Sequence, residues 1–300
     1  MTAPAVVTAT ETRVAVERKG KSRLGRWPTH LTIIVLMVIW LIPTIGLLIN
    51  SLRPSADVNE SGWWTAIFQP SQLSLDNYAH VLQQSDIPNQ FINSLFITIP
   101  ATIIPVLVAS FAAYAFAWMS FPGRNVLFVI VVGMLVVPLQ MTLIPILSLY
   151  GPKGLNIAGS FLTVWLAHTA YGLPFAIFLL RNFMGGLPKE VFESAAIDGA
   201  SPVTAFLRLA LPMSIPAIAA LVIFQFLFVW NDLLVALVFL GSSPQNLPMT
   251  VGISNLVTSL GGGWEFLGAA AFISMALPLA VFFGLQRYFV RGITGGAVKG

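Results

Sequence analysis

Six long apolar stretches dominate the sequence, and polar or charged segments separate them. Each stretch contains about 20 residues, the length that an α-helix needs to cross the roughly 30 Å hydrocarbon layer of a membrane. A helix at the surface of a soluble core keeps a polar face at helical spacing, whereas these stretches are apolar all round. The pattern therefore predicts six transmembrane helices. They are expected at Leu31–Ile49, Leu95–Met119, Val126–Leu149, Phe161–Leu180, Ile215–Leu240 and Phe266–Phe289.

The composition excludes a soluble enzyme. Hydrophobic residues make up 57% of the 300 residues and charged residues only 9%, whereas an average globular protein carries roughly 25% charged residues. The chain has no cysteine, which excludes disulfides and cysteine-ligated metals. We expect an all-α integral membrane protein, with no metal site and no catalytic residues.

The basic residues predict the orientation, because short cytoplasmic loops are enriched in lysine and arginine. With both termini inside, 13 of the 15 basic residues are cytoplasmic, and only Arg53 and Lys153 are external. In this N-in, C-in placement, the net charge of +4 reflects the topology of the chain and its contact with anionic lipid. We therefore expect no nucleic-acid partner. The inner basic residues are Arg13, Arg18, Lys19, Lys21, Arg23, Arg26, Arg124, Arg181, Lys189, Arg208, Arg287, Arg291 and Lys299.

The breaks between the apolar stretches divide the chain into five regions. The first helix is expected to be retained as a membrane anchor. In the basic arm before it, Gly20–Lys21–Ser22 resembles the end of a phosphate-binding loop, but Ala15 stands where that motif requires glycine, so we expect no nucleotide site in this chain. The regions are a basic cytoplasmic arm (1–30), the first helix (31–49), an external loop (50–90), a five-helix core (91–290) with an inner loop (181–212) and an outer loop (241–265), and a cytoplasmic tail (291–300).

The inner loop at 181–212 predicts two short helices. Proline suits a first helical turn and glycine a left-handed stop, so a helix is expected over Pro188–Asp198, ending at Gly199. A second helix is expected to begin with Ser201 as its N-cap and Pro202 in its first turn, and to end at Pro212.

The first of these helices carries an apolar face with small residues in its middle, at Val191, Phe192, Ala195 and Ala196. This face suits docking to a partner protein or a position on the lipid surface. Glu190 and Glu193 flank it, and carboxylates facing an anionic membrane surface favour the protein partner.

The same loop resembles a known family. Glu193-Ser194-Ala195-Ala196-Ile197-Asp198-Gly199, followed after nine residues by Leu209-Ala210-Leu211-Pro212, resembles the EAA loop of binding-protein-dependent ABC importer permeases. Serine and leucine replace the usual alanine and isoleucine at 194 and 209. Four further segments resemble carbohydrate-type permeases, among them the six-span permease of the maltose importer. They are Leu75-Asp76-Asn77-Tyr78, Asn93-Ser94-Leu95, Trp230-Asn231-Asp232 and the tail from Arg291 to Gly300.

The resemblance implies a type I ABC importer fold and a set of partners. These are a second homologous permease, two ATPase subunits that bind ATP and Mg, and an external solute-binding protein that delivers a sugar. The implied location is the plasma (inner) membrane of a bacterium or archaeon. The residues implied to couple to the ATPase are Glu190, Glu193, Ala195, Ala196, Asp198 and Gly199; those of the tail at the ATPase interface are Gly296, Val298 and Lys299; and those of the outer loop that contact the binding protein are Asn246, Met249, Asn255 and Thr258.

Polar residues within the apolar stretches are candidates for a translocation path, because polar groups at membrane depth are costly and mark function or helix pairing. Gln225 and Asp232 are seven residues apart and so share one helix face. Binding of sugar hydroxyls and interhelical bonding both remain open for Gln225, and a structural role is favoured for Asp232 and His168. The full candidate set is Gln140, His168, Tyr171, Gln225, Asn231 and Asp232.

Two other functions remain open at this point. A secondary transporter or channel without ATP needs coupling-ion residues or an inverted repeat, and the sequence offers only Asp232 and no internal symmetry. An ABC importer permease for a solute other than a sugar has the same inner loop.

Overall fold

The computed structural model describes residues 27–241, 243–256 and 262–297, with side chains except at 84 and 287–297. The described residues form helices joined by turns, with no strand among them. The chain divides into two parts, residues 1–46 and 47–300. Most of the basic arm, with its Gly20–Lys21–Ser22 segment, lies outside the described residues, as do Thr258, Val298 and Lys299.

Four single helices are long and apolar enough to cross a membrane, and two bent helix pairs bring the total to as many as six within the described residues. This agrees with the six predicted stretches. The single helices are α1 (Trp27–Ser51), α5 (Ile87–Trp118), α8 (Phe161–Met184) and α15 (Trp264–Ala297, apolar through Gln286). In the first part of the chain, the described residues belong to α1, whose mean hydropathy of 2.7 is as expected of an apolar anchor.

The third span is not the continuous helix that the sequence predicts over Val126–Leu149. It consists of α6 (Arg124–Gly133), the 3₁₀ turn η3 (Met134–Val136) and α7 (Leu139–Tyr150), with a bend of 101° between the halves. The cause is Pro138, because the residue before a proline is forced out of the helical region. Val137 is extended, with φ −72° and ψ 115°.

The fifth span is also broken. The second helix of the inner loop precedes this span and comprises α10 (Pro202–Ala205), a π-helical turn (Phe206–Ala210) and α11 (Leu211–Met213). The chain then bends by 73° into α12 (Ile215–Trp230). The helix ends at Met213, so the predicted stop at Pro212 agrees to within one residue. Proline lacks the N–H of a helical hydrogen bond, and the widened turn before it accommodates the ring. The span continues in α13 (Leu234–Leu240) after a break at 231–233.

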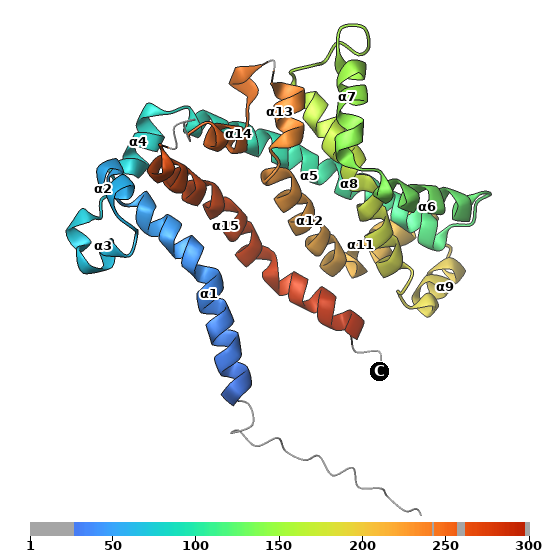
Figure 1. Ribbon diagram of the computed structural model, residues 1–300. Helices are drawn as coiled ribbons and strands as arrows, with labels where there is room; N and C mark the ends of the chain where they lie inside the picture. Colours follow the sequence, from blue (N-terminus) through green and yellow to red (C-terminus); the bar gives the residue numbers. More distant parts are fainter. Residues whose placement is uncertain (1–26, 242, 257–261, 298–300) are drawn as a thin grey trace, which may run out of the picture. The chain divides into compact units, whose positions relative to one another are not determined.

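The core of residues 47–300 lies where α5 packs along α8, and where α12 packs between α5 and α15 (Figure 1). Small residues at these contacts let the helix backbones approach closely, as is usual where helices associate in a membrane. Among the described residues, the alanines that are at most 1% exposed are Ala101, Ala109, Ala113, Ala167, Ala176, Ala210, Ala269 and Ala270.

The external segment before α5 folds around Arg53, whose side chain is fully buried. Its guanidinium group donates to oxygens of Asn50, Asp57, Ser61, Thr65 and Gln72, at 2.5–3.3 Å. These bonds satisfy the buried cation with neutral acceptors. They hold together α2 (Ser55–Glu60), α3 (Thr65–Phe68) and the 3₁₀ turn η2 (Pro70–Gln72), which precede α4 (Asp76–Gln84).

The Leu75–Tyr78 motif fastens α4 to the end of α1. Asn77 is 6% exposed, and its Nδ2 donates to the carbonyl oxygens of Ser51 at 3.0 Å and Arg53 at 2.7 Å. The hydroxyls of Tyr78 and Ser51 lie 2.9 Å apart. Asn77 therefore satisfies carbonyl groups at the end of α1 that no longer have a helical partner.

Candidate functional site

The first helix of the inner loop is α9 (Lys189–Ile197), with Pro188 and Asp198 as its flanking residues. This agrees with the predicted Pro188–Asp198 to within one residue at each end. The helix ends in a Schellman motif, in which the N–H of Ala200 donates to Ala195 O at 2.9 Å and that of Gly199 to Ala196 O at 3.1 Å. Gly199 has φ +79°, a left-handed conformation that favours glycine. The predicted stop is confirmed.

One face of α9 docks onto the protein itself. Phe192 is 8% exposed and stacks on Trp118, with ring centroids 3.8 Å apart and an interplanar angle of 20°. The Trp118 Nε1–H donates to the carbonyl of Met184 at 2.9 Å. Trp118 is the last residue of α5 and Met184 the last of α8, so α9 is joined to the inner ends of both helices.

The prediction that Val191, Phe192, Ala195 and Ala196 form one face for a partner is therefore wrong for Phe192. The aromatic ring reaches the protein core because Trp118, 74 positions earlier in the sequence, lies within stacking distance. Sequence reasoning missed Trp118, since helical spacing shows which residues share a face but not what that face covers.

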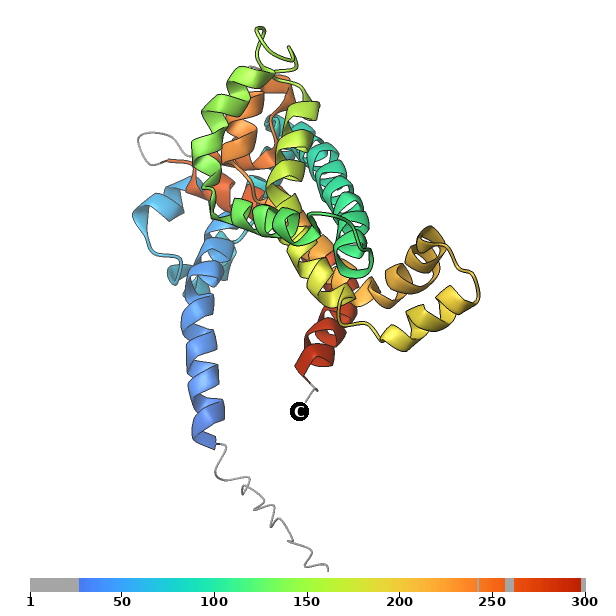
Figure 2. The same cartoon turned by 90° about the vertical axis from the view of Figure 1, so that its right-hand side faces the viewer.

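The coupling residues implied by the sequence keep free surface on α9, and Glu193 and Ala196 line the same hollow as Phe192. Glu190, Glu193, Ala196, Asp198 and Gly199 are exposed, and Ala195 is half-buried. Ile197, which the sequence did not single out, is 87% exposed beside them. The free surface thus combines three carboxylates with an exposed apolar side chain, a pattern complementary in charge to a partner with basic side chains. In Figure 2, α9 (yellow) lies beside the second helix of the inner loop (gold).

A hollow of about 470 Å³ separates α9 from the second inner-loop helix and the end of α5. The second helix begins as predicted, because the Ser201 Oγ accepts the N–H of Thr204 at 3.2 Å. The residues lining the hollow are Tyr114, Trp118, Met119, Ser120, Phe192, Glu193, Ala196, Ala200, Pro202 and Ala205.

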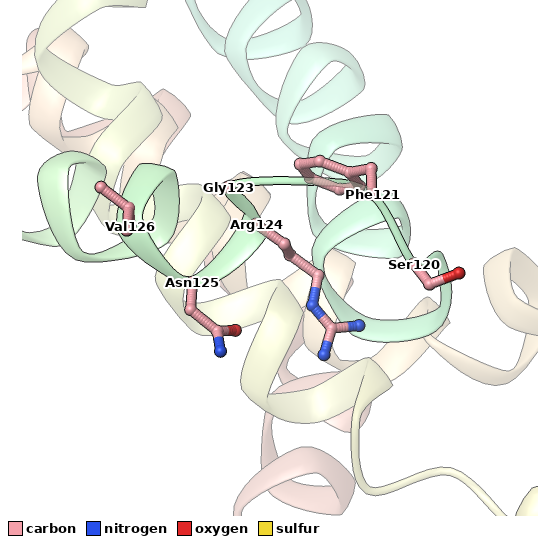
Figure 3. A pocket seen from close by; sticks show the side chains of 6 residues that line it. All are labelled: Ser120, Phe121, Gly123, Arg124, Asn125 and Val126. Atoms are coloured by element: carbon pink, nitrogen blue, oxygen red, sulfur yellow. The ribbon is translucent and has the colours of Figure 1, made fainter.

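The inner turn between α5 and α6 forms a second hollow, of about 370 Å³ (Figure 3). Its side chains come from Ser120–Val126, and Gly123 adopts φ +79° to start α6. The Arg124 guanidinium donates to the carbonyl of Met119 at 2.9 Å. Arg181 lies 4.8 Å from the ring of Phe128. Both arginines are on the side that the orientation rule assigns to the cytoplasm.

Gln225 connects three helices instead of lining an open cavity. It is 5% exposed, and its Nε2 donates from α12 to the carbonyl of Ala101 on α5 at 3.2 Å and to that of His168 on α8 at 3.5 Å. The amide fits because position 172 is glycine, where a Cβ would come within 2.6 Å of Gln225 Oε1. These contacts favour interhelical bonding, one of the two roles that the sequence leaves open.

Asp232 lies at the break of the fifth span and not inside a helix. Its carboxylate accepts the backbone N–H groups of Val235 at 3.3 Å and Ala236 at 3.0 Å. It thereby satisfies the free donors at the start of α13 and faces the positive end of that helix. His168 is fully buried, with Nε2 3.6 Å from Asp232 Oδ2. The structural role favoured for both residues agrees with these contacts.

The other path candidates do not join this cluster. The Tyr171 hydroxyl lies 2.8 Å from Thr142 Oγ1 and links α8 to α7. Asn231 donates to Leu227 O of its own helix at 2.8 Å. Gln140 is exposed in the first turn of α7. The six candidates therefore occupy separate places, with only Gln225, His168 and Asp232 brought together.

The outer loop is fixed to α5 by residues of the Asn93–Leu95 motif. Asn93 Nδ2 donates to the carbonyls of Gln245 at 2.8 Å and Leu247 at 3.0 Å, and Ser94 Oγ accepts the N–H of Met249 at 2.8 Å. These bonds position the 3₁₀ turn η5 (Pro244–Asn246) and α14 (Met249–Ser254). The Asn93–Leu95 motif therefore has a structural role, the attachment of the outer loop to α5, which the sequence alone does not show.

The four outer-loop candidates differ in their access to a partner. Asn255 is exposed, and Asn246 is half-buried with its Nδ2 on Gly159 O at 2.8 Å. Met249 is 1% exposed and packs in the cluster of Val81 and Ile87. We correct its role to internal packing, because its side chain has no free surface here. Thr258 lies outside the described residues.

The apolar spans and the capped inner-loop helix define a multi-pass membrane protein. A family model described as "Binding-protein-dependent transport system inner membrane component" matches residues 105–295. The chain belongs to this family. It is a permease subunit of an ABC importer and not an enzyme, and this excludes a secondary transporter or channel that works without ATP.

Relatives agree along nearly the whole chain. It is 57% identical over 275 residues to the osmoprotective compounds uptake permease protein GgtD of Synechocystis sp., covering 91% of this chain and 92% of that protein. It is 41% identical to the alpha-glucoside transport system permease protein AglG of Rhizobium meliloti, covering 91% and 97%. Among solved structures, a chain of a bacterial ABC transporter that imports the acidic polysaccharide alginate matches with a TM-score of 0.71 at 19% identity, covering 89% and 98%.

Proposed function

We propose that this chain forms half of the translocation path of an ATP-driven importer for an uncharged carbohydrate of the α-glucoside class. The second half is a homologous permease, and a solute-binding protein delivers the sugar from outside. Two ATPase subunits bind ATP and Mg. The membrane is the plasma (inner) membrane of a bacterium or archaeon.

The observation that carries the coupling part of this proposal is the two-sided arrangement of α9. Its outer face bears Glu190, Glu193 and Asp198, and its inner face stacks Phe192 on Trp118. A partner that pulls on the outer face moves α9 as a unit, because Gly199 and the Schellman motif fix its end. The stacked rings pass this movement to α5 and α8, and the second inner-loop helix passes it to α12.

The carbohydrate part rests on relatives. Permease proteins named for alpha-glucosides, arabinooligosaccharides and trehalose are 41%, 32% and 31% identical to this chain over 91–94% of its length. The more similar relative is named for osmoprotective compounds, a class defined by use and not by chemistry. A non-sugar osmolyte is therefore the second candidate substrate.

Purification of the complex from its native membrane tests the assembly. We expect recovery of a second permease and an ATPase with this chain. ATPase activity is then measured in proteoliposomes with the cognate binding protein, against trehalose, maltose, sucrose and glycine betaine. Stimulation by the sugars supports the proposal, whereas stimulation by glycine betaine alone refutes the carbohydrate class.

A charge reversal tests the docking surface. Glu193→Lys places a cation on the outer face of α9 and is expected to abolish binding-protein-stimulated ATPase activity or release the ATPase. Glu60→Lys is the matched control, because Glu60 is equally exposed but lies in the external segment. Unchanged uptake by Glu193→Lys would exclude the role of this carboxylate.

A further inference from the structure

A polar pocket of about 390 Å³ lies on the external side of the chain, between the start of α5 and η5. It is distant from the inner loop, because in Figure 1 α9 lies near the opposite end of α5 from α14. The residues lining it are Asp86, Asn89, Gln90, Ile92, Asn93, Pro244 and Gln245.

The two walls of this outer pocket are held at a fixed separation. The Asn93 side-chain amide donates two hydrogen bonds, at 2.8 and 3.0 Å, to the backbone carbonyls of Gln245 and Leu247 on the opposite wall. Asn246 anchors the same wall from behind through Gly159 O at 2.8 Å. The pocket is therefore formed without a ligand, which lowers the ordering cost of binding one.

The chemistry of the lining suits an uncharged polyhydroxy compound. Asn89, Gln90 and Asn93 of α5 and Gln245 of the opposite wall line the pocket with carboxamides, and Asp86 before α5 adds a carboxylate. The amide hydrogens of Asn93 are already engaged with the opposite wall. Gln90 Oε1 is buried against Gly252 of α14, so this oxygen is not open to a ligand in the pocket. Ile92, which is 60% exposed, and Pro244 add apolar surface of the kind that packs against the C–H faces of a sugar ring.

Charge argues against an acidic ligand. Of the described residues that line the pocket, none is cationic, and Asp86 is anionic. An acidic sugar would meet a carboxylate without a compensating lysine or arginine. The volume lies within the range of small-molecule sites, roughly 300–1,000 Å³, and is large enough for a disaccharide.

We infer that this pocket is an outer subsite that holds an uncharged sugar after the binding protein releases it and before it enters the path. The inference rests on the proposed import of a carbohydrate. It assigns this chain a substrate contact at the external entrance of the path.

The test uses the assembled complex in proteoliposomes, with saturating trehalose-loaded binding protein. Two quantities are measured together, the uptake of radiolabelled trehalose and the hydrolysis of ATP. In the double variant Asn89→Ala with Gln245→Ala, the sugar imported per ATP is expected to fall about 3- to 10-fold, since each lost hydrogen bond costs severalfold in affinity. ATPase stimulation is expected to stay at the wild-type level.

The control is Gln83→Ala, which removes an exposed carboxamide on neighbouring α4 outside the pocket and is expected to change neither quantity. A double variant with the wild-type ratio of sugar to ATP overturns the inference. A loss of ATPase stimulation with an unchanged ratio of sugar to ATP also overturns the inference, because that result marks the pocket as a contact for the binding protein. If the wild-type complex imports no sugar at all, the proposed function itself fails.

Discussion

Removal of the Phe192 ring is expected to uncouple ATP hydrolysis from transport. Phe192 is the buried residue of α9, and Trp118, its stacking partner, is the last residue of α5. The change Phe192→Ala leaves Glu190, Glu193 and Asp198 on the outer face unchanged. The ATPase therefore still finds its docking surface, but movement of α9 is no longer passed on to the spans.

The size of the effect follows from burial. Phe192 is 8% exposed, and truncation of a buried phenylalanine to alanine costs about 3–5 kcal/mol in protein cores. Loss of the stacked aromatic pair is included in that figure, at about 0.5–1.5 kcal/mol. Because the site lies at the edge of the protein, we take the lower limit of about 3 kcal/mol. This lowers the ratio of docked to undocked α9 by roughly a hundredfold.

The assay compares ATP hydrolysis and sugar uptake in proteoliposomes, after size-exclusion chromatography has shown that the complex is intact. Phe192→Ala is expected to reduce uptake at least tenfold more than it reduces ATPase activity. Phe192→Leu should recover part of the coupling, because leucine fills much of the same space. Val191→Ala, a truncation at a 37% exposed neighbour on α9, is the matched control. Full coupling in Phe192→Ala would refute the proposed route from α9 to α5.

Three further changes test the local geometry, each read as a shift in thermal unfolding of the detergent-solubilised protein. Gly199→Ala places a side chain at φ +79° and is expected to cost about 1–2 kcal/mol; an unchanged midpoint would show that the turn relaxes. Asp232→Ala removes both acceptors of the α13 donors and should cost about 1 kcal/mol, with Asp232→Asn retaining part; equal midpoints for the two variants would contradict the capping role. Gly172→Ala displaces the Gln225 amide and should cost about 1–3 kcal/mol by leaving it unpaired, whereas Gln225→Leu in that background should add little further loss.

The features that the sequence predicted well are local ones. Apolar length sets the spans, and α8 begins at the predicted Phe161. The stop at Gly199 and the cap at Ser201 depend on the conformational range of glycine and on a serine oxygen three residues from its donor. Such features are decided within one helical turn, so a single sequence contains the information that they need.

The features that the sequence missed depend on contacts between distant segments. Arg53 counted only as an external charge, although its six hydrogen bonds organise the segment before α5. The sequence placed Asp232 within a span, because apolar residues flank it on both sides from Ile215 to Leu240. Only the structure shows that its carboxylate starts a new helix there.

The inner loop shows why a correct motif gave an incomplete account of its own helix. Helical spacing grouped Phe192 with Ala195 and Ala196, since all are apolar and near one another on the helical surface. A coupling helix, however, needs two surfaces, one for the moving partner and one for the part that it moves. In the proposed coupling, Phe192 serves the second surface, because its ring stacks on Trp118, and the exposed Glu193 serves the first, although both side chains line the same hollow. The residues of α9 therefore differ in burial, and contact with Trp118, far away in the sequence, decides which of them packs against the spans.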